Sequence, residues 1–123
     1  MKQVTWEQVG QKFNPILSPA YISNGLVFSS GSVGVRSDGV VAETAAEQTT
    51  LAIENMKTVL EKSGSNLNKV VKVLLFITDE KDSKVVNEVY HKYFPHLPAR
   101  SCVIVKFPST SLKVELECVA EVV

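Results

Sequence analysis

The sequence predicts an α+β fold in which a mixed β-sheet carries two helices on one of its faces. Three observations predict it: short apolar segments with turn signals near the N-terminus, two amphipathic helical segments in the middle, and strand-like segments between and after them. The expected order is β-β-β-α-β-α-β-β, and residues 1–123 are expected to form one domain.

The first strands are expected around two turn signals. The segment AYISNGLVFSSG reads as two short strands joined by Asn24-Gly25, because both turn residues tolerate a positive φ. The segment SVGVRSDGVV repeats the pattern with Asp38-Gly39 as its turn. We therefore expect an early antiparallel meander.

Two helices are expected after these strands. The first spans Glu43 to Gly64, because Thr44 and Glu47 have capping-box spacing and Gly64 is a typical helix stop. The second runs from about Asp82 to Phe94 and is ended by a proline. The apolar stripes expected to face the core are Thr49, Ile53, Met56, Val59 and Leu60 in the first helix and Val85, Val86, Val89, Tyr90 and Tyr93 in the second.

Three further strands carry most of the apolar residues. The segment KVVKVLLFITD is expected to be buried on both faces, and LPARSCVIVKF, residues 97–107, reads as core except for Arg100 and Cys102. In KVELECVAEV the apolar residues alternate with glutamates. The expected faces are Val71, Val73, Leu75 and Ile77 against Val70, Leu74 and Phe76 in the first of these strands, and Val114, Leu116, Cys118, Ala120 and Val122 against Glu115, Glu117 and Glu121 in the last.

This arrangement also predicts an assembly. Two helices of these lengths cover only one face of a sheet, whereas the strand from Val70 to Ile77 is apolar on both faces. The simplest cover for the second face is the sheet of another copy, so we expect a closed homo-oligomer with sites between subunits.

Composition narrows the classes of function. Thirteen basic residues balance thirteen acidic ones, so a nucleic-acid partner is not supported. No apolar run is long enough for a membrane span, and the N-terminus lacks the features of a presequence. We expect a cytoplasmic protein, and a mitochondrial location stays open if a presequence has been removed. Cys102 and Cys118 lack metal-ligand spacing and are expected to be free thiols.

A few residues are candidates for chemistry. Arg100 opens a strand, where its guanidinium could bind a carboxylate with two hydrogen bonds or pair with a surface glutamate. Cys102 lies on the same strand face and could contact the same ligand or be a small buried hydrophobe. Glu115 could hold a water for hydrolytic deamination if it faces the same cleft, or lie on a solvated edge. Asn87 is a weaker candidate, and a catalytic role is expected for no histidine.

Five separated motifs resemble one known family. PARSCV, followed by KVELE, resembles the signature of the YjgF-like family of reactive-intermediate deaminases, also called the RidA family. The motifs SSG, VVKVLLFITD and VNEVYHKYF match the family pattern in the same order, so that the resemblance covers nearly the whole chain after about Ala20.

The resemblance implies a fold, an assembly and an activity. The fold would be chorismate-mutase-like, assembled as a homotrimer whose sheets form a central barrel with three clefts between subunits. The activity would be hydrolysis of reactive 2-imino acids and their enamine tautomers, such as 2-aminoacrylate and 2-iminobutyrate, to 2-keto acids and ammonia. No metal or organic cofactor is implied.

The resemblance also implies a role for each candidate residue. Arg100 would bind the substrate carboxylate, and Glu115 would hold the attacking water. Asn87 would help to order the site. The remaining substrate contacts would come from Ser30 and Gly31, whose backbone approaches the ligand, and from Cys102, which lines the pocket and offers its N–H.

Two departures from the family pattern leave other functions open. Leu17 stands where many members have a tyrosine that closes over the ligand, and Ser32 follows Ser30-Gly31 where the family usually has glutamine. A module that binds or senses a 2-keto acid without converting it is therefore an alternative. An RNA-directed activity, described for some members, is disfavoured by the balanced charge.

Overall fold

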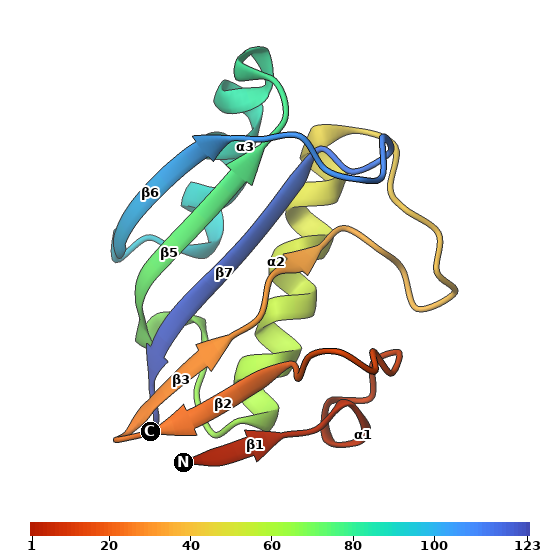
Figure 1. The fold of residues 1–123 in the computed structure, drawn as a ribbon. Helices are drawn as coiled ribbons and strands as arrows, with labels where there is room; N and C mark the ends of the chain where they lie inside the picture. Colours follow the sequence, from red (N-terminus) through yellow and green to blue (C-terminus); the bar gives the residue numbers. More distant parts are fainter.

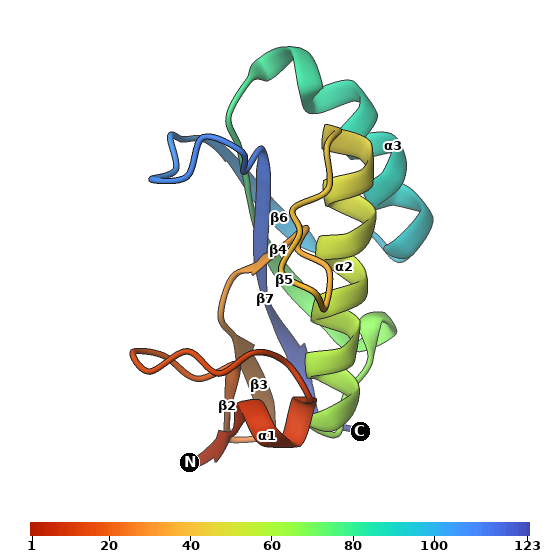
Figure 2. The same cartoon turned by 90° about the vertical axis from the view of Figure 1, so that its right-hand side faces the viewer.

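A seven-stranded mixed sheet runs through the molecule, and two long helices lie on one of its faces (Figures 1 and 2). The structure is a computed structural model that describes residues 1–123. The strand order is β1-β2-β3-β7-β5-β6, with β4 also paired to β7, and β5 and β6 form the parallel pair. The elements are β1 (Lys2–Val4), α1 (Trp6–Val9), β2 (Ala20–Ser23), β3 (Leu26–Ser29), β4 (Ser32–Val33), α2 (Ala45–Lys62), β5 (Val70–Ile77), α3 (Ser83–Tyr93), β6 (Ala99–Ile104) and β7 (Val114–Glu121).

The α+β class and the two helices on one face are confirmed, and two short elements precede the expected ones. The N-terminal strand β1 has three residues and α1 has four, too few to show a period in the sequence. Helix α1 nevertheless begins with a complete capping box, in which Thr5 and Gln8 each bind the other's backbone N–H.

The first hairpin forms as expected, whereas the meander does not continue. Asn24 and Gly25 have φ angles of 51° and 76°, the values of the tight turn that joins β2 to β3. After Ser30 and Gly31 the chain does not turn back on β3. Both β3 and β4 pair with β7, because the chain bulges between them and then continues along the same partner strand. The predicted turn at Asp38-Gly39 forms, with a φ of 88° at Gly39 and a bond from its N–H to the Arg36 carbonyl oxygen, but the flanking Val35 and Val41 make only an isolated bridge instead of two strands.

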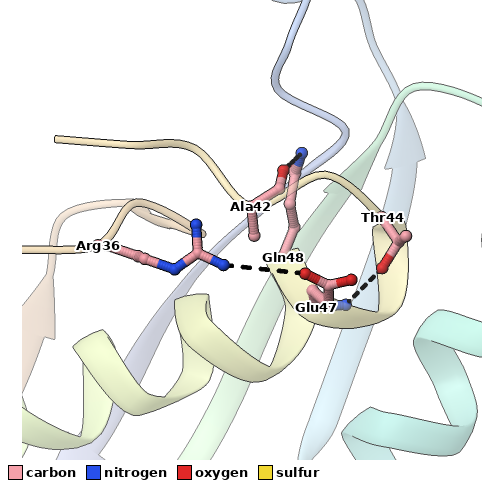
Figure 3. Close-up of polar contacts among 5 residues, drawn as sticks. All are labelled: Arg36, Ala42, Thr44, Glu47 and Gln48. Atoms are coloured by element: carbon pink, nitrogen blue, oxygen red, sulfur yellow. Dashed lines mark hydrogen bonds and ion pairs between the residues drawn. The ribbon is translucent and has the colours of Figure 1, made fainter.

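Helix α2 begins and ends near the expected residues. The Thr44 hydroxyl accepts the N–H of Glu47 at 3.1 Å, but the Glu47 carboxylate does not complete the capping box. It lies 3.9 Å from the Arg36 guanidinium instead (Figure 3). The helix ends before Gly64, whose φ is 83°. The predicted stripe of α2 is buried throughout.

The start of α2 is tied to the start of β7 by one buried polar side chain. Gln48 Nε2 donates to the carbonyl oxygens of Ala42 at 2.9 Å and Ser111 at 2.8 Å (Figure 3 shows the bond to Ala42). Gln48 Oε1 accepts the N–H of Lys113 at 2.8 Å. Gln48 was not expected in the core, and its hydrogen bonds explain how its amide is accommodated there.

The faces of β7 were predicted correctly, and those of β5 in part. Val73, Leu75 and Ile77 are buried beneath the helices as expected. At the start of the strand, Val70 is buried and Val71 is exposed, the reverse of the expectation, because the pairing with β7 is irregular between Val70 and Lys72. In β7 the expected apolar face is buried up to Ala120, while Val122 lies beyond the strand and is exposed.

Strand β6 differs most from expectation. The segment from Leu97 to Phe107 was expected to be core, but β6 pairs only with β5 and forms an edge of the sheet. Its side chains are exposed in one chain apart from that of Arg100, which is partly buried. An apolar, β-branched sequence predicts a strand but not whether that strand is central or at an edge.

The sheet face opposite the helices is uncovered in one chain (Figure 2). The strand pairing aligns Phe28 with Val119, and Phe76 with both Glu115 and Val103, on this face. Phe28 and Val103 are each 44% exposed. The loop before β2 and the loop between β6 and β7 project on this side of the sheet (Figure 2). None of the helices has the length and apolar character that crossing a membrane would need.

Candidate functional site

Arg100 lies on the helix-covered side of β6, facing α3. It is paired with Val73 of β5, whose side chain is buried beneath the helices. One guanidinium nitrogen, Nη1, donates to Asn87 Oδ1 at 2.8 Å. The guanidinium carbon lies 4.7 Å from the centre of the Tyr90 ring. The strand and the helix together therefore fix the direction of this cation.

No carboxylate pairs with Arg100. The ion pairs of the chain are Arg36 with Glu47 and Lys81 with Asp79. The alternative that Arg100 is paired with a surface glutamate is therefore wrong for this chain. Its bond to Asn87 uses one N–H, and the rest of the guanidinium makes no hydrogen bond within the chain. These donors remain available for a bidentate contact with a carboxylate.

Cys102 lies two residues after Arg100 and shares its strand face, as expected from strand periodicity. Its thiol is free, and the residue is exposed. The alternative that Cys102 is a small buried hydrophobe is therefore wrong for the single chain. Cys118, the other free cysteine, is buried, and burial raises the pKa of its thiol to about 11.

Glu115 and Gly31 meet on the other face of the sheet. A Cβ atom added to Gly31 would lie 2.7 Å from both Cδ and Oε2 of Glu115, so the carboxylate is packed directly against the glycine backbone. Glu115 is partly buried, and its pKa is raised, first by burial and then by the nearby charge of Glu117. A carboxylate in such a setting is a better base than an exposed one.

Ser30 joins this group to the loop before β2. Its hydroxyl donates to the carbonyl oxygen of Ser18 at 2.6 Å, and its N–H donates to the carbonyl oxygen of Pro19 at 2.9 Å. The same loop carries Leu17, which is 44% exposed and whose carbonyl accepts the Trp6 indole N–H. The two bonds of Ser30 therefore tie the loop that carries Leu17 to the Ser30-Gly31 segment.

One chain does not bring Arg100 and Glu115 together. Arg100 shares a face with Val73, Leu75 and the helices, whereas Glu115 is paired with Phe76 on the uncovered face. Two groups result. The first, formed by Arg100, Asn87 and Cys102, lies at the β6 edge beside α3, and the second, formed by Ser30, Gly31 and Glu115, lies at the break between β3 and β4.

The cavity nearest to these groups borders only part of the second one. A cavity of about 460 Å³ between α1, α2 and residues 30–39 is lined in part by Ser30 and Gly31. It does not reach Arg100 or Glu115. A ligand bound by both groups would need a wall that one chain does not supply.

Tyr90 is the residue of this region that sequence reasoning missed. It was predicted only as part of the apolar stripe of α3. Its position three residues after Asn87 is the signal that could have found it, because residues at this spacing share a helix face. Of the two histidines, His91 is exposed and His96 Nε2 lies 2.9 Å from the Val70 carbonyl oxygen. No group of three or more His, Cys, Asp or Glu side chains converges anywhere in the chain.

Comparison with known proteins gives a consistent result. A family model described as Endoribonuclease L-PSP matches residues 12–122. The chain is 40% identical to protein mmf1, mitochondrial, of Schizosaccharomyces pombe, over 80% of this chain and 63% of that protein. It is also 40% identical to Reactive Intermediate Deaminase A, chloroplastic, of Arabidopsis thaliana, over 84% of this chain and 57% of that protein. The chain thus spans less than two thirds of the length of these two relatives.

A solved structure supports the same comparison at the level of the fold. The crystal structure of Escherichia coli TdcF with bound serine is similar with a TM-score of 0.86 and 28% identity, and the match covers 98% of each chain. The similarity therefore extends over all the elements that carry the two groups of candidate residues.

Proposed function

The chain belongs to the YjgF/RidA family, which includes proteins named reactive intermediate deaminases, and we propose that it is itself a deaminase of reactive 2-imino acids. Its substrates would be 2-iminobutyrate, 2-aminoacrylate and related imine or enamine acids. Water adds to the carbon of the C=N bond, that bond breaks after protonation of the nitrogen, and a 2-keto acid and ammonia leave. The atoms balance with water alone, so the proposal includes no cofactor.

The observation that carries this proposal is the state of Arg100. Its guanidinium is held by neutral groups, and most of its N–H donors are unused. A planar guanidinium with free donors matches the two oxygens of a carboxylate, the one charged group shared by all these substrates. Cys102 and Asn87, on the same side, would line the carboxylate end of the pocket and order it.

Glu115 would supply the water. Its raised pKa makes the carboxylate more basic, and its contact with Gly31 means that this basic oxygen lies beside backbone that carries no side chain. Ser30 and Gly31 would allow the substrate to approach this backbone closely, and Glu115 would orient the water toward the imine carbon.

We further propose that the complete site forms between copies in a homotrimer with a chorismate-mutase-like fold and a central barrel. The support is that Arg100 and Glu115 lie on opposite faces of one sheet. A second copy placed on the uncovered face would bury Phe28 and Val103 and bring its own edge strand to Glu115. The proposed trimer would thus both bury the exposed apolar side chains of the sheet and complete the site.

A coupled assay tests the activity. The purified protein is added to a threonine dehydratase reaction containing semicarbazide, which traps the imine as a semicarbazone. We expect the protein to lower the semicarbazone signal and release 2-oxobutyrate faster, and Arg100→Ala to abolish the effect. The absence of any effect with the wild-type protein, or full activity in Arg100→Ala, would contradict the proposal.

A binding module for a small carboxylate is the second candidate, and Leu17 is the observation that favours it. Without the tyrosine that many family members have at this position, the pocket would bind a 2-keto acid but close over it less well. This function predicts thermal stabilisation by 2-oxobutyrate that depends on Arg100, without turnover in the coupled assay.

An RNA-directed activity is less well supported, although the family model is described as an endoribonuclease. Thirteen basic and thirteen acidic residues leave no net charge to attract phosphates. The location also stays a prediction: the sequence favours the cytoplasm, whereas two relatives have mitochondrial and chloroplastic in their names.

A further inference from the structure

We infer that Tyr90 is the positioning residue of Arg100, and that its ring face and the Asn87 amide together fix the plane of the guanidinium for a carboxylate ligand. The inference rests on the proposed function of Arg100 and adds a residue to which nothing above assigns a role in the site. It concerns how the cation is held, not which bonds change in the reaction.

The Tyr90 ring is a rigid support. Tyr90 is 7% exposed, and Phe94, the residue directly after the end of α3, packs against its ring with ring centres 4.6 Å apart. Phe94 is itself completely buried. The Arg100 guanidinium carbon lies 4.7 Å from the Tyr90 ring centre, within the range of a cation–π contact. The ring therefore restricts movement of the guanidinium toward the helix.

Asn87 supplies the second restraint. It lies one turn before Tyr90 on the same face of α3, and its Oδ1 accepts from Arg100 Nη1 at 2.8 Å. The cation–π contact restrains the guanidinium on the side of the helix, and the hydrogen bond at one corner restrains its rotation. The directions of the remaining N–H donors of Arg100 are then determined by Tyr90 and Asn87 of α3.

Both restraints are neutral, which distinguishes them from a carboxylate partner. Burial raises the pKa of Tyr90 to about 12, so the phenol is uncharged at physiological pH. Asn87 has no charge at any pH. The cation is consequently oriented but not neutralised, and its charge stays available for the ligand. A glutamate in place of Asn87 would orient Arg100 and also compete with the substrate.

The Tyr90 hydroxyl does not take part in this support. It is buried and has no hydrogen-bond partner. A buried hydroxyl without a partner costs stability, so its presence does not explain the position of the ring. This separates the ring from the hydroxyl and makes Tyr90→Phe an informative conservative variant.

The test compares Tyr90→Leu with Tyr90→Phe and with Tyr93→Leu in the coupled assay. Tyr93 lies on the same helix and packs partly against the core, whereas the ring beneath the Arg100 guanidinium is that of Tyr90, so Tyr93→Leu is a matched control. We expect Tyr90→Leu to raise KM about tenfold with kcat changed less than about threefold, because the ligand anchor is loosened. Tyr90→Phe should restore the wild-type KM, and Tyr93→Leu should leave KM unchanged even where it lowers the melting temperature. Tyr90→Met serves if Tyr90→Leu does not fold.

A second readout is independent of turnover. In ¹H–¹⁵N spectra, the Nε–H signal of Arg100, assigned by its loss in Arg100→Lys, should be shifted by the ring current in the wild type and Tyr90→Phe and lose this shift in Tyr90→Leu. A wild-type KM in folded Tyr90→Leu, or an unshifted Arg100 signal in the wild type, would overturn the inference while leaving the deaminase proposal intact. If the wild type has no activity, the same comparison is made on the dissociation constant for 2-oxobutyrate, or on the Nε–H signal alone if no binding is found.

Discussion

At the scale of single residues, the pair Glu115 and Glu117 gives the site a defined pH dependence. The two glutamates lie on the same face of β7, and the negative charge of Glu117 is the second cause, after burial, of the raised pKa of Glu115. In the proposed reaction, Glu115 must be ionised to accept a proton from water. Activity should therefore fall as the pH decreases through a pKa above the ordinary glutamate value.

Replacing Glu117 tests this assignment. In Glu117→Gln the repulsive charge is absent, so the pKa of Glu115 decreases and the acid limb of the pH profile of kcat/KM should move to lower pH by about half a unit. Glu121→Gln, further along the same face, is the control and should leave the limb in place. If the acid limb of the kcat/KM profile lies at the same pH in Glu117→Gln as in the wild type, Glu115 is not the titrating group.

The candidate residues illustrate what residue type can predict. Arg100 was a candidate because its charge opens an apolar strand, whereas Glu115 was distinguished from the other glutamates of its strand by the family resemblance. The bond between Arg100 and Asn87 was not predictable, because it depends on the distance between an edge strand and a helix. The exposure of Cys102 depends on the same edge position.

At the scale of elements, alternation along each strand was predictable but the pairing between strands was not. The face of β7 follows from its sequence alone, since apolar residues alternate with glutamates. In β5 one irregular pairing between Val70 and Lys72 exchanges the faces at the strand start. The separation of Arg100 from Glu115 results from the registers of β5 with β6 and β7, which join segments far apart in the sequence.

The contact of α2 with the strand β4 depends on Gly34. A Cβ atom at this position would lie 2.5 Å from Cα and 2.7 Å from the carbonyl oxygen of Gln48, both backbone atoms that no rotamer change can move. Gly34→Ala should therefore push the helix away and lower the melting temperature by about 5–15 °C, measured by circular dichroism. Ser37→Ala, an exposed change in the same segment, should shift it by less than about 2 °C. A wild-type melting temperature in Gly34→Ala would contradict this close packing.

At the scale of the whole molecule, the uncovered face and the divided site point to the same arrangement. One chain has a helix-covered core and an opposite face with Phe28 and Val103 each 44% exposed. It also has the Arg100 and Glu115 groups on different faces. The proposed closed ring of copies would account for both, because each copy would cover its neighbour's sheet and supply the missing half of its neighbour's site.

Mixing two inactive variants tests this arrangement directly. Arg100→Ala and Glu115→Ala should each be inactive alone. If every site takes Arg100 from one copy and Glu115 from the next, random trimers refolded from an equal mixture should recover about a quarter of wild-type activity, because that fraction of interfaces pairs two intact groups. The native mass should be about three times the 13.5 kDa of one chain. Mixing without unfolding is the control and should stay inactive while the trimers do not exchange subunits. If the site instead lay within one chain, every copy would lack one group, and the refolded mixture would remain inactive at any ratio of the two variants.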